Sequence, residues 1–100
     1  MVRVLRLCPG RAPEVVEIEN SLDALQRAVG GHIEVVNAAN RLDLIVNEDG
    51  AHDLLGTFDG TSIKGVALLV RKDAAGEIVD VTDEDIAEVV AGFVPARTMN

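Results

Sequence analysis

The sequence predicts an α+β fold in which a mixed or antiparallel sheet of five to six strands carries two helices packed on one face. A short helix with a marked start and a marked end occupies residues 22–29. Apolar runs built from Val, Leu, Ile and Ala, whose branched members favour sheet, fill most of the first seventy residues. A second helix start, Thr-Asp-Glu-Asp, begins at Thr82.

Strands are expected where apolar residues alternate with polar ones or run without a break. Cys8-Pro9-Gly10 ends the first strand, because Pro has no amide hydrogen and Gly permits a tight turn, so the first two strands form an antiparallel hairpin. The last long run is apolar on both faces, which is typical of a central strand. The expected strands are Val2–Leu7, Val15–Ile18, His32–Val36, Leu42–Val46, Ile63–Arg71 and Ile78–Val81, and residues 51–62 show no clear periodicity.

The two helices are defined by their ends. Asn20 or Ser21 can cap the helix over Leu22–Val29, and Gly30 can adopt the left-handed conformation that stops it. Thr82 caps the second helix, which Pro95 ends, and its expected apolar stripe is Ile86, Val89, Val90 and Phe93. A chain of 100 residues has room for one core, so residues 1–95 form a single domain and residues 96–100 are expected to fray.

The charge and hydropathy of the chain exclude several classes of partner. The net charge is −8, and clusters of Lys and Arg are absent, so phosphate backbones are repelled and direct binding to nucleic acid is not expected. The longest apolar run, residues 65–70, is far shorter than the roughly 20 residues of a membrane-spanning helix. We therefore expect no membrane partner and a cytoplasmic location in a bacterial host.

A second copy of the chain is an expected partner. The sequence is 48% hydrophobic, and two helices on one face of the sheet leave the other face without cover. A symmetric homodimer would supply part of that cover.

Cys8 and the two histidines, His32 and His52, are the residues with the most versatile side chains for catalysis or metal binding. Their spacing matches no zinc motif, and no base is placed by a motif beside the thiol. We therefore assign no catalytic residue, no metal site and no cofactor.

Two segments are candidates for binding. The glycine- and hydroxyl-rich segment from Gly56 to Gly65 could hold a small anionic ligand through Thr61, Ser62 and Lys64, or it could be a plain surface loop. The acidic start of the second helix could meet a basic protein partner, or it could be a solvated face; its residues are Asp83, Glu84, Asp85 and Glu88.

Several segments together resemble an uncharacterised family, a domain of unknown function found in small phage and bacterial proteins. The most specific are the Gly-Gly-x-Ile-Glu-Val-Val segment at Gly30–Val36 and the Asn-Glu-x-Gly turn at Asn47–Gly50, and Gly65 and Thr82–Asp85 also match. The resemblance covers roughly residues 2–90. It implies phage or mobile-element ancestry and supplies no activity.

These observations together favour a small non-enzymatic binding protein of phage or mobile-element type that engages a host protein, for example as a counter-defence factor. The alternative is a ligand-sequestering module that holds a small phosphorylated or nucleotide molecule at a dimer crevice, with Thr61, Ser62 and Lys64 as its ligand contacts.

Overall fold

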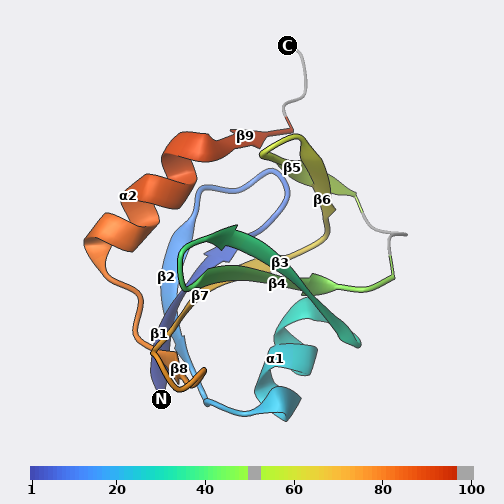
Figure 1. Cartoon of the computed structure of the whole chain (residues 1–100). Coiled ribbons are helices and arrows are strands. Elements are labelled where there is room, and N and C mark those ends of the chain that lie inside the picture. Colours follow the sequence, from blue (N-terminus) through green and yellow to red (C-terminus); the bar gives the residue numbers. More distant parts are fainter. Residues whose placement is uncertain (50–52, 97–100) are drawn as a thin grey trace.

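A computed structural model describes residues 1–49 and 53–96 (Figure 1). The elements follow one another as β1 (Val2–Leu7), β2 (Glu14–Ile18), α1 (Leu22–Val29), β3 (Ile33–Ala39), β4 (Leu42–Asn47), β5 (Leu54–Phe58), β6 (Thr61–Lys64), β7 (Ala67–Lys72), β8 (Ile78–Val79), α2 (Asp83–Gly92) and β9 (Phe93–Pro95).

The strands form two antiparallel sheets. The larger sheet has the order β2-β1-β7-β4-β3, with β8 paired to β7, and the smaller has the order β6-β5-β9. The predicted α+β class, with an antiparallel sheet of six strands and two helices, is confirmed. β7 lies between β1 and β4, as the unbroken apolar run predicts for a central strand.

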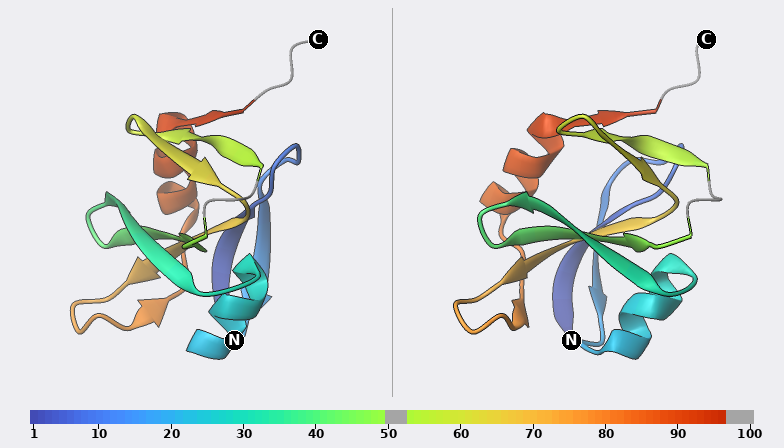
Figure 2. Two further views of the ribbon diagram at one scale, coloured as in Figure 1. Left: turned by 90° about the vertical axis from the view of Figure 1, so that its right-hand side faces the viewer. Right: turned by 45° about the vertical axis from the view of Figure 1, so that its right-hand side comes forward.

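The two helices lie on opposite faces of the larger sheet, which corrects the expectation that they share one face. Leu25 and Val29 of α1 pack with the residues of β1, β4 and β7 that point to one face. On the other face, Val89 of α2 packs together with Leu55 and Ile63 of the small sheet. Figures 1 and 2 show α1 at one end of the molecule and α2 with the small sheet at the other.

This arrangement removes the reason given for a homodimer. The second face of the larger sheet, expected to need cover from another chain, is covered by α2 and by the small sheet of the same chain. Any second copy must therefore bind elsewhere on the molecule.

The ends of α1 are where the sequence places them. The Ser21 hydroxyl accepts a hydrogen bond from the Ala24 amide at 3.1 Å, so Ser21 rather than Asn20 is the N-cap. Gly30 has φ of 83° and donates its amide hydrogen to Gln26 O, which ends the helix.

The segment expected to be a loop is a β-hairpin. β5 and β6 pair antiparallel through a turn at Asp59 and Gly60, whose φ values of 52° and 80° are the positive angles that tight hairpin turns need. The expected strand Ile63–Arg71 is accordingly two strands in two sheets, because the chain leaves the small sheet after β6 and enters the larger one at β7. Apolar and polar residues alternate over too few positions in this segment for the sequence to distinguish two short strands from a loop.

The second helix is shorter than expected. α2 ends at Gly92, and the chain continues as β9, which pairs with β5. Phe93 is therefore a strand residue, and Val90 is 41% exposed rather than part of a buried stripe. Ala96, assigned to the fraying tail, donates its amide hydrogen to Leu55 O at 2.9 Å; the rest of that tail, 97–100, lies outside the described residues.

Candidate functional site

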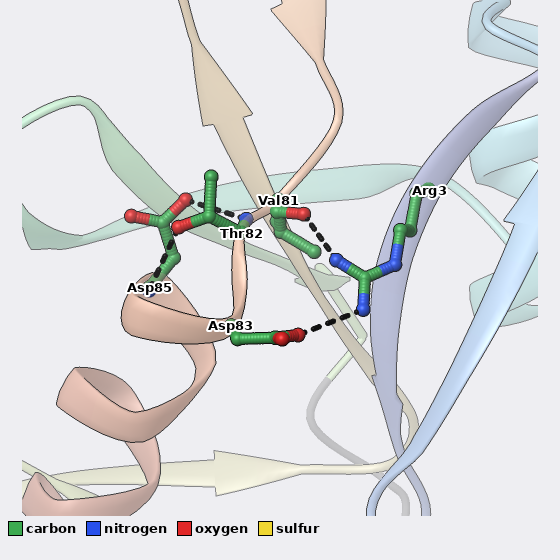
Figure 3. Close-up of polar contacts among 5 residues, drawn as sticks. All are labelled: Arg3, Val81, Thr82, Asp83 and Asp85. Carbon is green, nitrogen blue, oxygen red and sulfur yellow. Dashed lines mark hydrogen bonds and ion pairs between the residues drawn. The ribbon is translucent and has the colours of Figure 1, made fainter.

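The acidic segment at the start of α2 is held by hydrogen bonds within the chain (Figure 3). The Asp85 amide donates to the Thr82 hydroxyl at 3.1 Å, and the Thr82 amide donates to the Asp85 carboxylate at 2.9 Å. This reciprocal pair is a capping box, which satisfies two backbone amides that the helix start would leave without acceptors. The predicted cap at Thr82 is confirmed.

Asp85 is also fixed to the sheet. The guanidinium of Arg71 on β7 donates to its carboxylate at 2.7 Å, and the Asp85 side chain is only 7% exposed. Asp85, one of the four residues proposed to meet a partner, therefore lies buried between α2 and the sheet, where it anchors the helix.

Arg3 on β1 holds the same segment from the other side (Figure 3). Its guanidinium donates to Val81 O at 2.6 Å and to the Asp83 carboxylate at 3.0 Å, and its backbone amide donates to the Asp80 carboxylate at 2.8 Å. The Asp83 carboxylate remains 94% exposed. Sequence reasoning missed Arg3 because these partners lie almost eighty positions away in the chain.

Asp83 is exposed and pairs with Arg3, and the other two exposed acidic residues of the predicted set are Glu84 and Glu88. They lie one turn apart on α2, beside exposed Ala87 and Ala91. The structure thus divides the four acidic residues into one that is buried, one that pairs with Arg3 and two that form a solvated helical face.

The predicted anion-binding residues lie on an edge strand. Thr61, Ser62 and Lys64 are exposed on β6, while Ile63 between them is buried. They are brought close together, as the sequence suggests, but on a hairpin strand rather than in a glycine-rich loop.

A groove of about 550 Å³ lies where the β1–β2 loop faces the end of α2 and β9. Its floor contains the buried side chains of Leu7 and Leu55, and Phe93 and the exposed Val90 contribute to one wall. The β1–β2 loop forms the other wall. The complete lining is Leu7, Cys8, Gly10, Arg11, Ala12, Pro13, Leu55, Val90, Phe93, Pro95 and Ala96.

An ion pair fixes the base of this loop. Arg6 on β1 donates to the Glu14 carboxylate on β2 at 2.7 Å, across the register that places the two residues opposite each other. The hydrogen bond from Arg6 and its positive charge lower the pKa of Glu14 below 4.5. This ion pair therefore holds together the two strand ends from which the β1–β2 loop, one wall of the groove, extends.

Two of the three residues considered for catalysis or metal binding, Cys8 and His32, lie within the described residues. Cys8 is a free, half-buried thiol in the groove, His32 is exposed before β3, and His52 lies outside the described residues. Within residues 1–49 and 53–96, no group of three His, Cys, Asp or Glu side chains is placed to hold a metal ion.

A known family matches most of the chain. The model of the family described as Domain of unknown function (DUF3846) matches residues 2–94. The chain belongs to this DUF3846 family. A comparison with curated proteins and one with solved structures found no match.

The family confirms the predicted resemblance to an uncharacterised domain of unknown function. Its description carries no activity, so any function of this DUF3846 domain must be argued from its surfaces. Among the helices that the structure describes, neither is long and apolar enough to cross a membrane.

Proposed function

We propose that this DUF3846 domain is a non-enzymatic binding protein that engages a protein partner through the groove between the β1–β2 loop and α2–β9. The observation that carries this proposal is the groove itself, about 550 Å³ in volume, with the apolar side chains of Leu7, Leu55 and Phe93 among its lining. A pocket of this size suits an apolar or aromatic anchor side chain, which supplies most of the affinity in many protein interfaces.

The surface beside the groove favours a protein over a small molecule. Val90 lies at the groove wall, and the exposed face of α2 extends from it through Ala87 and Ala91 to Glu84 and Glu88. Small side chains let a partner approach the helix closely, and the two carboxylates favour basic residues around its anchor. The phage or mobile-element ancestry implied by the resemblance makes a bacterial host protein, met in the host cytoplasm, the partner class of this proposal.

The alternative, a module that sequesters a phosphorylated molecule, has less support. The groove lining does not include Thr61, Ser62 or Lys64, and these residues lie on a short edge strand. A nucleotide at a hundred times its dissociation constant would stabilise the fold by ~2.7 kcal/mol, so a thermal-shift screen distinguishes the two functions.

Affinity capture with matched variants tests the proposal. Val90→Asp places a charge at the groove wall, and Leu22→Asp places one on α1, at a residue that is 57% exposed on the opposite side of the sheet. The immobilised wild-type domain and Leu22→Asp should retain the same bacterial proteins, which Val90→Asp should lose. Replacement of Glu84 and Glu88 by Lys should weaken the same capture.

Equal recovery by Val90→Asp and by the wild-type domain would refute the groove as the binding surface. Recovery of no specific protein by the wild-type domain, together with a thermal shift in the nucleotide screen, would favour the sequestering module instead.

A further inference from the structure

The open edges of the two sheets differ in how they are protected. The outermost strand of a sheet leaves every second backbone N–H and C=O group without a strand partner, and such an edge is a template for pairing with another chain. Among the described residues, the outermost strands are β2 and β3 in the larger sheet and β6 and β9 in the smaller one. β8, which pairs only with β7, has two residues and is too short to serve as an edge for another strand.

Three of these four edges carry features that oppose pairing. β9 has three residues and ends in Pro95, which has no N–H, and the Phe93 N–H is already bonded to Val90 O. β2 carries the exposed Glu14 and Glu17 within five residues. β6 has four residues and ends in the exposed Lys64, a residue typical of protected edges.

β3 carries no such protection. It is seven residues long, the longest strand described, and contains neither proline nor a basic residue. Its only charged residue is Glu34, and Val35 next to it is 54% exposed. The bulge in its pairing with β4 lies between Asn37 and Ala39, so that Ile33–Asn37 is a regular strand.

The pairing with β4 determines which backbone groups of β3 face outward. His32 O accepts the amide hydrogen of Glu48 at 2.9 Å, so His32 and Glu48 are a hydrogen-bonded pair. In an antiparallel ladder such pairs alternate along the strand with pairs that share no hydrogen bonds. Glu34 and Val36 are therefore the residues that exchange hydrogen bonds with β4. The N–H and C=O groups of Ile33, Val35 and Asn37 point away from the sheet.

We propose that β3 is a homodimer interface at which a second copy of the chain pairs its own β3 antiparallel, about a twofold axis at Val35. In this register Val35 lies opposite Val35 of the second copy, and Ile33 lies opposite its Asn37. All three outward-facing residues of each copy then exchange backbone hydrogen bonds, and the two larger sheets become one continuous sheet.

The side chains of β3 fit this occupant. Glu34 lies opposite Val36 of the second copy, so the only charged residue of the strand does not face its own equivalent. Val35 lies opposite Ile45, which packs against α1, so the two exposed Val35 side chains cover one another on the face of the sheet that carries α1. A strand of this composition meets itself without a like-charge pair directly across the interface.

The net charge of the chain makes the dimer depend on salt. Two copies with a charge of −8 each repel over long distances, and salt screens this repulsion. The backbone hydrogen bonds and the valine contact are affected much less. The dimer is therefore expected to be tighter at high salt than at low salt, opposite to an interface that is held by ion pairs.

Disulfide cross-linking of the full chain tests the register. Directly opposite residues that share backbone hydrogen bonds have Cα atoms about 5.5 Å apart, within the range that a disulfide spans. In a Cys8→Ala background, Val35→Cys should form a covalent dimer under mild oxidation. Val15→Cys, on β2 at the other end of the sheet and 45% exposed, should remain monomeric in the same background.

Light scattering after size exclusion tests the interface without cross-linking. The wild-type chain should have twice the mass of one 10.6 kDa chain at high salt, and Val35→Lys should have the mass of one chain while still unfolding in a cooperative transition, which shows that the variant is folded. Val15→Lys, the matched control, should keep the double mass. A wild-type monomer at every salt concentration, an unaffected Val35→Lys dimer, or equal cross-linking at the two cysteine positions would overturn the proposal.

This inference is independent of the groove, whose lining contains no residue of β3. Failure of the dimer leaves the proposed function intact, and failure of the partner capture leaves the dimer intact.

Discussion

Asn47 at the end of β4 closes the C-terminal end of α1. Its side-chain nitrogen donates to Val29 O at 3.0 Å, and its side-chain oxygen accepts the amide hydrogen of Asp49 at 2.7 Å. The residue is 8% exposed, so these bonds replace water at a carbonyl group that the helix end leaves without a helical donor. One amide side chain thus joins a helix, a strand and the turn that follows it.

Asn47→Ala should lower the free energy of unfolding by about 1–3 kcal/mol, because it leaves the Val29 carbonyl without this donor. Urea denaturation followed by circular dichroism measures the loss. Asn20→Ala is a matched control, since Asn20 donates a similar bond to Ile78 O at 3.0 Å in an exposed position where water can replace it. Equal losses in the two variants would show that burial of the Asn47 bond adds nothing.

Asp85→Ala should lower the free energy of unfolding by about 2–3 kcal/mol. The substitution removes one half of the capping box and leaves the guanidinium of Arg71 without its carboxylate. Asp83→Ala, two positions away, breaks an ion pair whose carboxylate is 94% exposed and should cost much less. Urea unfolding of both variants checks this order, and a larger loss for Asp83→Ala would contradict it.

Gly56→Ala should weaken the pairing between β5 and β9 in the small sheet. A Cβ atom at this position would overlap the Val94 carbonyl oxygen and the ring of Phe93, both in β9. Relief requires β9 to move away from β5, at a cost of about 1–3 kcal/mol. Hydrogen exchange should show faster exchange of the Ala96 amide, which donates to Leu55 O.

Ser62→Ala, on the exposed side of the same hairpin, is the control for this substitution. It should leave both the stability and the Ala96 exchange rate unchanged. Because Phe93 and Pro95 line the groove, Gly56→Ala is also expected to weaken partner capture, and unchanged exchange at Ala96 would refute the predicted displacement.

The pKa of Glu14 should rise towards 4.5 in an Arg6→Gln variant, because the hydrogen bond and charge of Arg6 lower it in the native protein. A carboxyl group whose pKa is lower in the folded state stabilises the fold above its unfolded pKa, and this stabilisation is lost as the pH falls through the folded pKa. The wild-type domain should therefore lose more stability than Arg6→Gln on acidification from about pH 5.

Titration of the Glu14 side-chain carboxyl carbon by nuclear magnetic resonance measures this shift directly. Arg27→Gln removes a guanidinium that forms ion pairs with Glu19 and Asp23, and it should leave the Glu14 titration unchanged. The prediction is wrong if Glu14 titrates at the same pH with and without Arg6.

Much of the fold could be predicted because its signals are local. The hairpin of β1 and β2, the caps Ser21 and Thr82, and the position of β7 as a central strand all follow from patterns within a few residues. The hairpin of β5 and β6 could not be recognised, since one strand contains Gly56 and the other alternates over only four residues. Asp59-Gly60 was the one local signal that could have found its turn.

The candidate site was much less accessible from the sequence. Asp83 and Asp85 look equivalent to Glu84 and Glu88 in a run of acidic residues, yet Arg3 and Arg71 approach only the first two. The groove combines residues of the β1–β2 loop with Leu55 and with residues from the end of α2 and from β9, and no spacing rule relates these segments. Contacts between residues so far apart depend on the path of the whole chain.

The sequence by itself determined the class of fold, the ends of α1, the start of α2 and membership of the DUF3846 family, because short-range hydrogen bonds and hydrophobic alternation are written in neighbouring residues. Only the tertiary structure decided that the helices take opposite faces, that Phe93–Pro95 joins β5, and that β3 is one of the edge strands. These features depend on which face of the sheet each connection crosses and on which strands become neighbours. An amphipathic pattern indicates that one face of a helix or strand is buried, but it does not indicate which other element covers that face.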